Sequence, residues 1–381
     1  MNIATQAAQI GLEWDTRTGA VTVPIYQTAT FRHPGLGQST GYDYSRSGNP
    51  TRQALEEGIA RLDGAARGFA YSSGMAAITS LLFLFRHGDH IIVTEDLYGG
   101  TYRLFEQIFQ QYGLEFSYVD TSDISLVEAA VRPNTKALFV ESLTNPLLKV
   151  ADISCLAALC KSRELLCIVD NTFLTPYLLR PLELGADMAI YSGSKYLSGH
   201  NDTICGLVTV KDPLLAEKVY FHQNGAGAIL GPQDSWLTIR GIKTLSVRLD
   251  RQQENAAVVA SWLQKHPQVT RVYYPGLADH PGHELHKSQA DGFGAMIAFE
   301  VTSPALVEKL LLHTKLISFA ESLGGVETLM TFPAVQTHAD IEPEKRENMG
   351  INNRLLRLSI GIENATDLIA DLEQAFNGEE L

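Results

Sequence analysis

Cysteine is scarce in this chain of 381 residues, which contains only four. They lie in apolar stretches typical of helices or strands, and they are Cys155, Cys160, Cys167 and Cys205. No two of them form a CxxC pair, a common short signature of a metal or redox site. We therefore expect four reduced thiols in the protein core, rather than disulfides or a metal centre.

Long apolar runs and an excess of positive charge are also missing. No apolar run reaches the roughly 18 residues of a membrane-spanning helix. Residues 1–20 contain no basic region followed by an apolar core, so we expect no signal peptide and a cytoplasmic protein. With 30 basic and 43 acidic residues, the net charge is −13. That balance argues against nucleic acid or a membrane surface as the main partner.

Histidine gathers at one place, the run HPGHELH, which contains His280, His283 and His286. The run contains no HExxH motif, and it begins with residues that favour a turn rather than a helix. Because zinc sites on helices need a defined spacing of ligands, we expect no metal site here.

Apolar strands alternate with amphipathic helices from about residue 68 onwards. The clearest strands are at 90–95, 165–171 and 187–192, each apolar over nearly its whole length. Strands of this kind are buried on both faces. The pattern therefore predicts an α/β protein with a mainly parallel central sheet that is covered by helices on both sides.

The length exceeds what a single core comfortably supports, so we expect two domains. Residues 1–50 are rich in Thr, Gly, Pro and Tyr, and we expect an arm that contacts a neighbouring subunit. We assign residues 51–240 to a large ligand-binding domain that begins with a helix capped by Thr51. A glycine-rich passage then interrupts the pattern, and residues 241–381 form a smaller C-terminal α/β domain.

One lysine, Lys195, stands among small and hydroxyl residues in the run SGSKYLSGHND. Small neighbours let another molecule approach the ammonium closely, and the apolar strand before it suggests partial burial. Burial lowers the pKa of a lysine and makes its amine nucleophilic. A nucleophilic lysine and an ordinary surface charge both remain open on this stretch alone.

Further polar residues follow the strands, at the sheet edge where ligands bind in such folds. Asp170 ends an apolar strand and needs a partner, which is either a backbone N–H or arginine, or a protonated ring nitrogen. The helix start Ser73–Met75 is either a simple N-cap or an anion site. The hydroxyls of Ser192 and Ser194, beside the lysine, would serve the same anion.

Two more side chains have a structural and a functional interpretation. Tyr98 follows a strand beside two glycines, and it either covers the core or stacks on a planar ring. Arg357 alternates with apolar residues, and it requires either a structural salt bridge or the carboxylate of a substrate. Together with Lys195 and Asp170, these features predict pyridoxal phosphate, a planar pyridine aldehyde with a phosphate.

The chain also resembles the Cys/Met-metabolism family of pyridoxal-phosphate enzymes. This family includes cystathionine γ-synthase, cystathionine β- and γ-lyases, methionine γ-lyase and homoserine-ester sulfhydrylases. The runs that carry the resemblance span the chain, and they are YDYSRSGNPTR, SSGMAA, DLYGGTYR, TNP, VDNTF, SGSKYLSGHND, RGIKTL, AESLGG and RLSIGIE. The resemblance implies the fold type I of aspartate aminotransferase and a homotetramer built from two catalytic dimers.

The resemblance also implies roles at the matching positions. Lys195 resembles the lysine that forms the Schiff base and carries protons, Asp170 the partner of the ring nitrogen, and Tyr98 the stacking tyrosine and candidate acid. The implied phosphate site consists of Ser73, Gly74, Met75, Ser192 and Ser194, with Tyr44 and Arg46 reaching it from the neighbouring subunit. The implied substrate site consists of Arg357, Asn145, Ser322, Glu321 and Asp43.

From these matches we expect a C–S lyase that cleaves cystathionine by γ- or β-elimination, because Asp43 and Glu321 suit its distal ammonium. The alternative is γ-replacement, as in cystathionine γ-synthase or O-acetylhomoserine sulfhydrylase. Gly100 stands where methionine γ-lyases typically carry cysteine, which disfavours that activity. Gln336 replaces the methionine of the commoner run PxxMTH, near the family's substrate entrance. A non-catalytic protein and a simple aminotransferase are the remaining alternatives.

Overall fold

The computed structural model describes residues 1–12, 15–339 and 341–378. Its larger sheet has seven strands in the order β1-β7-β6-β5-β4-β2-β3. The strands are β1 (Arg67–Tyr71), β2 (His90–Thr94), β3 (Glu115–Val119), β4 (Thr135–Glu141), β5 (Leu166–Asp170), β6 (Met188–Ser192) and β7 (Gly206–Val210). All neighbours are parallel except β7, which runs antiparallel to both β6 and β1. The expected mainly parallel sheet is thus confirmed.

Side chains along β4 and β5 alternate between two buried clusters. Leu138, Val140 and Val169 belong to one cluster, whereas Phe139 and Ile168 belong to the other. Since successive side chains of a strand point to opposite faces, both faces of the sheet are buried. This two-sided burial explains why the strands are apolar throughout rather than alternating with polar residues.

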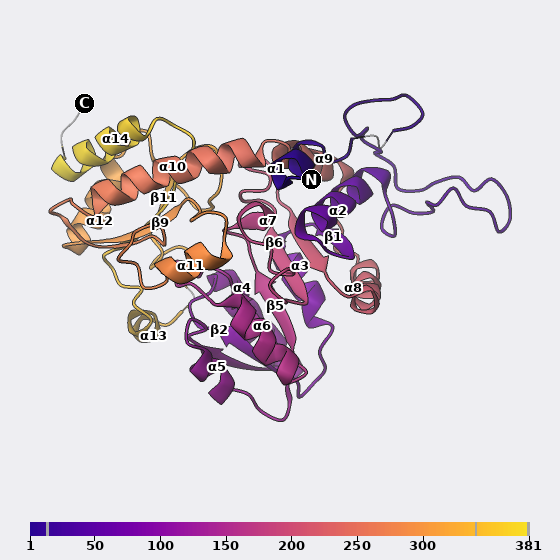
Figure 1. Ribbon diagram of the computed structural model, residues 1–381, viewed down its shortest axis with the longest axis horizontal. Coiled ribbons are helices and arrows are strands. Elements are labelled where there is room, and N and C mark those ends of the chain that lie inside the picture. The colour runs from indigo at the N-terminus through magenta and orange to yellow at the C-terminus, as the bar shows by residue number, and fades with distance from the viewer. Residues whose placement is uncertain (13–14, 340, 379–381) are drawn as a thin grey trace.

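Helices and short helical turns connect these strands and cover the sheet (Figure 1). They are α2 (Pro50–Asp63), α3 (Gly74–Leu82), α4 (Gly99–Arg103), the π-helical turn Leu104–Ile108, the 3-10 turn Phe109–Tyr112, α5 (Ile124–Ala129), α6 (Ile153–Ser162), α7 (Thr175–Leu178), α8 (Pro213–Ala226) and α9 (Pro232–Ile242). None of the helices in the described part of the chain is long and apolar enough to cross a membrane.

A second sheet has five strands in the order β10-β11-β12-β9-β8. These are β8 (Val269–Tyr273), β9 (Met296–Val301), β10 (Ser318–Phe319), β11 (Leu329–Thr331) and β12 (Leu355–Ser359). The helices around it are α10 (Leu245–Leu263), α11 (His283–Gln289), α12 (Pro304–His313), α13 (Pro343–Asn348) and α14 (Ala365–Asn377). The domain boundary that we expect at 240 falls within α9, and the division into domains stays a prediction.

The N-terminal part begins with α1 (Ile3–Ala8), and much of the extended segment 15–49 then projects away from the two sheets (Figure 1). The expected cap of α2 at Thr51 is wrong. Asn49 caps this helix instead, because its side chain accepts hydrogen bonds from the backbone N–H groups of Thr51 and Arg52. Pro50 at the first helical position needs no such partner and has the required φ.

Thr51 and Arg52 fasten the extended segment to α2. The Thr51 hydroxyl donates to the carbonyl of Pro24 at 2.8 Å. Arg52 is 2% exposed, and its guanidinium donates to the carbonyls of Ser45 and Arg46 at 2.7 and 3.1 Å. The buried guanidinium of Arg52 therefore holds the backbone that carries Arg46.

Candidate active site

A cavity of about 900 Å³ lies at the carboxyl edge of the larger sheet, between it and the smaller sheet. That volume is within the range of small-molecule sites. Most of the predicted site residues line it, from both halves of the chain. They are Ser73, Gly74, Met75, Tyr98, Asn145, Asp170, Ser192, Ser194, Lys195, Glu321, Ser322 and Arg357.

Lys195 follows β6 and reaches into this cavity. Its Nζ donates a hydrogen bond to Oγ of Ser322 at 2.8 Å. Burial lowers the pKa of Lys195 to about 8, with a smaller contribution in the same direction from the Arg357 charge. A neutral, nucleophilic amine is therefore accessible near physiological pH, which an ordinary surface lysine does not offer.

Asp170 is the last residue of β5, and burial raises the pKa of its carboxyl. The backbone N–H and the hydroxyl of Thr172 both donate to Oδ1, at 3.0 and 2.6 Å. Across the described residues, no lysine or arginine forms an ion pair with Asp170 and nothing donates to its Oδ2. A cationic N–H group from a ligand would supply the partner that this carboxylate lacks.

The start of α3 and the end of β6 approach each other closely. A Cβ atom on Gly74 would lie 3.2 Å from both Cβ and Oγ of Ser192, so glycine permits this approach. The Ser73 hydroxyl accepts from the N–H of Ala76 at 3.0 Å and thus acts as the N-cap. The Ser194 hydroxyl bonds to the backbone of Cys205. The helix start and Ser192 remain as groups for an anion.

Arg357 lies in the middle of β12 and is only 1% exposed. Its guanidinium donates to Oδ1 of Asn145 at 2.7 Å and to the carbonyl of Ser322 at 3.1 Å. Its Nε has no hydrogen-bond partner, and no carboxylate of the described residues forms an ion pair with it. Burial lowers its pKa to about 10. The geometry thus suits a ligand carboxylate better than a structural salt bridge.

Tyr98 precedes α4 and is 41% exposed, with its ring beside Gly100. A Cβ atom on Gly100 would lie 2.5 Å from Cε1 of that ring. Any larger residue at position 100 therefore requires the ring to move. The backbone N–H of Tyr98 donates to Oε1 of Glu141 at 2.9 Å.

Three predicted residues lie on the N-terminal segment and do not line the cavity of this chain. Asp43 accepts a hydrogen bond from the Ser39 hydroxyl at 2.8 Å. Arg46 donates to the carbonyl of Asn224 at 2.6 Å, and Tyr44 is 47% exposed. Their predicted contribution to the site of a neighbouring subunit stays a prediction.

Gln336, which we singled out as a departure near the substrate entrance, is not part of the cavity lining. Its Oε1 accepts a hydrogen bond from the backbone N–H of Phe332 at 2.8 Å. Thr337 lines the cavity in its place. The glutamine therefore stabilises its own turn, and any effect on specificity would have to pass through that turn.

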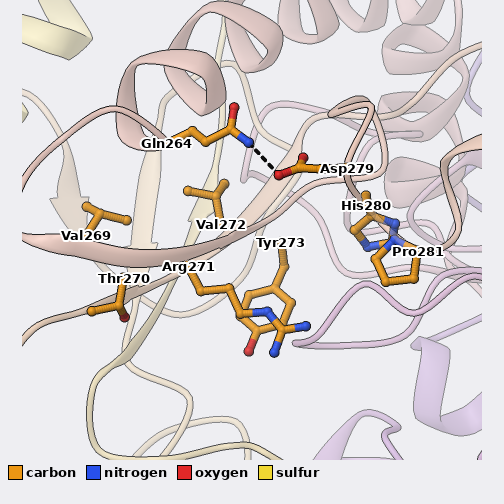
Figure 2. Close-up of a pocket in the computed structure, with 9 residues that line it drawn as sticks. All are labelled: Gln264, Val269, Thr270, Arg271, Val272, Tyr273, Asp279, His280 and Pro281. Atoms are coloured by element: carbon orange, nitrogen blue, oxygen red, sulfur yellow. Dashed lines mark hydrogen bonds between the residues drawn. The ribbon is translucent and has the colours of Figure 1, made fainter.

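A second, smaller cavity of about 230 Å³ lies beside β8 (Figure 2). Arg271 covers the ring of Tyr273 there, and Gln264 donates to Asp279 at 2.7 Å. Of the predicted residues, only His280 lines it. The neighbouring histidines contact backbone carbonyls, His283 that of Pro275 and His286 that of Gly292. The described residues contain no group of three or more side chains placed to hold a metal ion.

Comparison with known proteins supports the predicted family. Residues 4–377 match the family model for Cys/Met metabolism PLP-dependent enzymes. The chain belongs to this family. It is 51% identical to a cystathionine gamma-lyase of Bacillus subtilis (96% of each chain covered) and 50% identical to a cystathionine beta-lyase of Lactococcus lactis (98% of each). A cystathionine gamma synthase from Xanthomonas oryzae, solved with aminoacrylate and cysteine, superposes with a TM-score of 0.97 at 41% identity, covering 99% of this chain and 98% of that one.

The cavity fits the pyridoxal phosphate of this family. Asp170 lacks a cationic partner, and Lys195 carries an amine of lowered pKa. At the start of α3, Gly74 lies close to Ser192, so the backbone N–H groups of the helix start and the Ser192 hydroxyl are near each other. Asp170 suits the ring nitrogen of the cofactor, Lys195 suits the aldehyde, and the helix start with Ser192 suits the phosphate.

Thr172 and Glu141 are among the polar residues of the cavity that the sequence did not single out. Thr172 lies in the run VDNTF, two positions after Asp170, and an Asx-type turn was the available signal. Glu141 ends β4 as Asp170 ends β5, and the two face each other in register. Asp170 was predicted because it is an acidic residue at the end of an apolar strand, and the same pattern would have identified Glu141.

Proposed function

We propose that this protein is a pyridoxal-phosphate-dependent C–S lyase that cleaves cystathionine. With one water molecule, γ-elimination yields cysteine, 2-oxobutanoate and ammonia, whereas β-elimination yields homocysteine, pyruvate and ammonia. The observation that carries the proposal is that one cavity contains the amine of Lys195, the buried guanidinium of Arg357 and the carboxylate of Glu321. Relatives at 50–51% identity that are named cystathionine lyases support the same substrate.

The cofactor, when bound, supplies an electron sink for the negative charge that forms at Cα of the substrate. Asp170 holds the positive charge on the ring nitrogen. Arg357 and Asn145 bind the α-carboxylate and orient the Cα–H bond towards the Lys195 amine. That amine removes the proton, because its pKa of about 8 leaves a substantial neutral fraction.

Cleavage also needs an acid and a recognition site at the far end of the substrate. Tyr98 lines the cavity and has a hydroxyl that can give a proton to the departing sulfur. Glu321 is next to Ser322 and lines the cavity, where its charge complements the distal ammonium of cystathionine. We assign Tyr98 the role of acid and Glu321 the role of specificity residue.

The same site supports γ-replacement, in which cysteine or sulfide displaces the leaving group of a homoserine ester. The likeness to a cystathionine gamma synthase favours this second candidate. Methionine γ-cleavage is disfavoured, because Gly100 stands where enzymes of that activity typically carry a cysteine.

A product profile separates these candidates. Purified enzyme with pyridoxal phosphate is incubated with cystathionine alone, and separately with O-acetylhomoserine and cysteine. We expect a thiol and a keto acid from the first mixture, and their identities distinguish γ- from β-elimination. Failure to release either product from cystathionine, with cystathionine formed in the second mixture, would overturn the lyase in favour of the synthase.

We further propose that the active enzyme is a cytoplasmic homotetramer of two catalytic dimers, in which Tyr44 and Arg46 reach the neighbouring phosphate site. The extended segment with exposed Val21 and Leu36 supports such a contact. A Lys195→Ala protein mixed with an Arg46→Ala protein under exchange conditions should recover roughly a quarter of wild-type activity, because half of the dimers then hold one intact site. No recovery, despite exchange confirmed by mass spectrometry, would overturn this assignment.

A further inference from the structure

Glu141 is a buried carboxylate in the active-site cavity to which no role has been assigned above. It is the last residue of β4, is 6% exposed, and lines the cavity. It faces Asp170 across the parallel pair β4–β5. The described residues provide no lysine or arginine in an ion pair with it.

The two oxygens of Glu141 hold two different loops. Oε1 accepts from the backbone N–H of Tyr98 at 2.9 Å, and Oε2 accepts from the backbone N–H of Asn145 at 3.0 Å. Tyr98 belongs to the loop after β2, whereas Asn145 belongs to the turn after β4. The Glu141 carboxylate thus fixes the position of Tyr98 relative to Asn145.

This link extends to the second half of the chain. The Asn145 side chain accepts a hydrogen bond from Arg357 at 2.7 Å, so Glu141, Asn145 and Arg357 form a continuous polar chain along the cavity. Burial and the neighbouring Asp170 both raise the pKa of Glu141. Burying a second carboxylate beside Asp170 lowers the stability of the fold. Pairs of buried acidic groups of this kind are found most often at functional sites.

We propose that Glu141 is a positioning residue that sets the spacing between Tyr98, over the cofactor, and Asn145, at the substrate carboxylate. The inference rests on the roles proposed above for these two residues. Glu141 itself touches backbone groups, so it acts through them rather than on the reacting atoms.

Glu141→Gln provides the test, with Asp371→Asn as a matched control. A glutamine keeps the shape, but its amide nitrogen cannot accept the second backbone N–H. Asp371 is also buried and also accepts from backbone N–H groups, those of Lys315, Leu316 and Ile317. It does not line the cavity, so its replacement reports the effect of a lost buried acceptor alone.

Four quantities are measured for both variants. These are the dissociation constant of pyridoxal phosphate from the apo-protein by absorbance titration, KM and kcat for cystathionine, and the melting temperature. For Glu141→Gln we expect the cofactor dissociation constant and KM each to rise about tenfold, with a smaller change in kcat. Glu141→Asp keeps the carboxylate, and we expect its cofactor dissociation constant and its KM to lie between those of the wild type and those of Glu141→Gln. Asp371→Asn should lower the melting temperature only.

The proposal is overturned if Glu141→Gln behaves as Asp371→Asn does, with a lower melting temperature and unchanged constants. Should Glu141→Gln fail to fold, Glu141→Asp against Asp371→Asn makes the same comparison, because aspartate is too short to reach both loops. If wild-type enzyme does not cleave cystathionine, the proposed function fails, whereas the cofactor titration still decides the role of Glu141.

Discussion

Lys195 and Ser322 lie 2.8 Å apart, measured from Nζ to Oγ, although they are separated by 127 positions in the chain. Ser322 has a backbone φ of 93°, which is uncommon for a residue with a side chain. Its carbonyl also accepts a hydrogen bond from Arg357. One residue in a strained conformation thus contacts both the nucleophilic amine and the buried guanidinium, as strained residues at functional sites often do.

Replacement of Lys195 by alanine should reduce cystathionine turnover by about 1,000-fold or more, because the amine that moves the Cα proton is lost. Bound pyridoxal phosphate should remain detectable by absorbance. Lys211→Ala is the control, since that lysine donates to the carbonyl of Leu182 and does not line the cavity. Substantial residual turnover in Lys195→Ala would refute the assigned role.

Arg357→Ala should raise KM for cystathionine by about 100-fold, because a substrate carboxylate loses its charged partner. Cofactor affinity should change little. Arg248→Ala is a matched control. Arg248 is also a buried arginine with a pKa lowered to about 10, but it donates to backbone carbonyls, including those of Tyr196 and Gly241. Equal losses of substrate and cofactor binding in Arg357→Ala would indicate a structural role instead.

The rate at which apo-protein takes up pyridoxal phosphate should rise with pH and level off above a midpoint near 8. The reason is that only the neutral amine of Lys195 is nucleophilic, and its pKa is about 8. Stopped-flow absorbance from pH 6 to 10 measures this rate. Free Nα-acetyl-lysine, whose pKa is about 10.4, is the control and should show no plateau in that range. A protein profile that matches the free amine would contradict the lowered pKa.

Asp63 should make the stability of the fold depend on pH. It is buried, and Tyr191 and Thr209 donate to its Oδ2. Burial raises its pKa from 3.8 to about 6, so the folded state binds the proton more tightly than the unfolded state. The stabilisation is fully present below pH 3.8 and is lost as the pH rises through 6.

Asp63→Asn removes this dependence because asparagine does not titrate. Between pH 4 and 8, the free energy of unfolding of the wild type minus that of the variant should fall by about 2.5 kcal/mol. Urea unfolding of the apo-proteins measures both values. Parallel pH profiles for the two proteins would contradict the raised pKa of Asp63.

The larger sheet and the residues on its carboxyl edge were predictable because strand apolarity and strand ends are local in sequence. Lys195 follows such a strand and Asp170 ends one, and both line one cavity. The pairing of Lys195 with Ser322 was not predictable in detail, since it depends on how the two sheets pack. The cap of α2 was misassigned because Asn49 and Thr51 are both good caps, and the tertiary contact of Thr51 with Pro24 decides between them.

Glu321→Ala tests the choice of substrate. Glu321 lines the cavity beside Ser322, and we expect its loss to raise KM for cystathionine about tenfold, equivalent to about 1.4 kcal/mol. KM for homocysteine, which has no distal ammonium, should stay within about twofold because no charge pair is lost. Glu327→Ala is the control, since Glu327 accepts from Asn201 and is not part of the lining. If the two KM values change together, Glu321 does not recognise the distal ammonium, and another acidic residue must set the preference for cystathionine. Asp202 and Asp234, which line the cavity, and Asp43 of the extended segment are then the candidates.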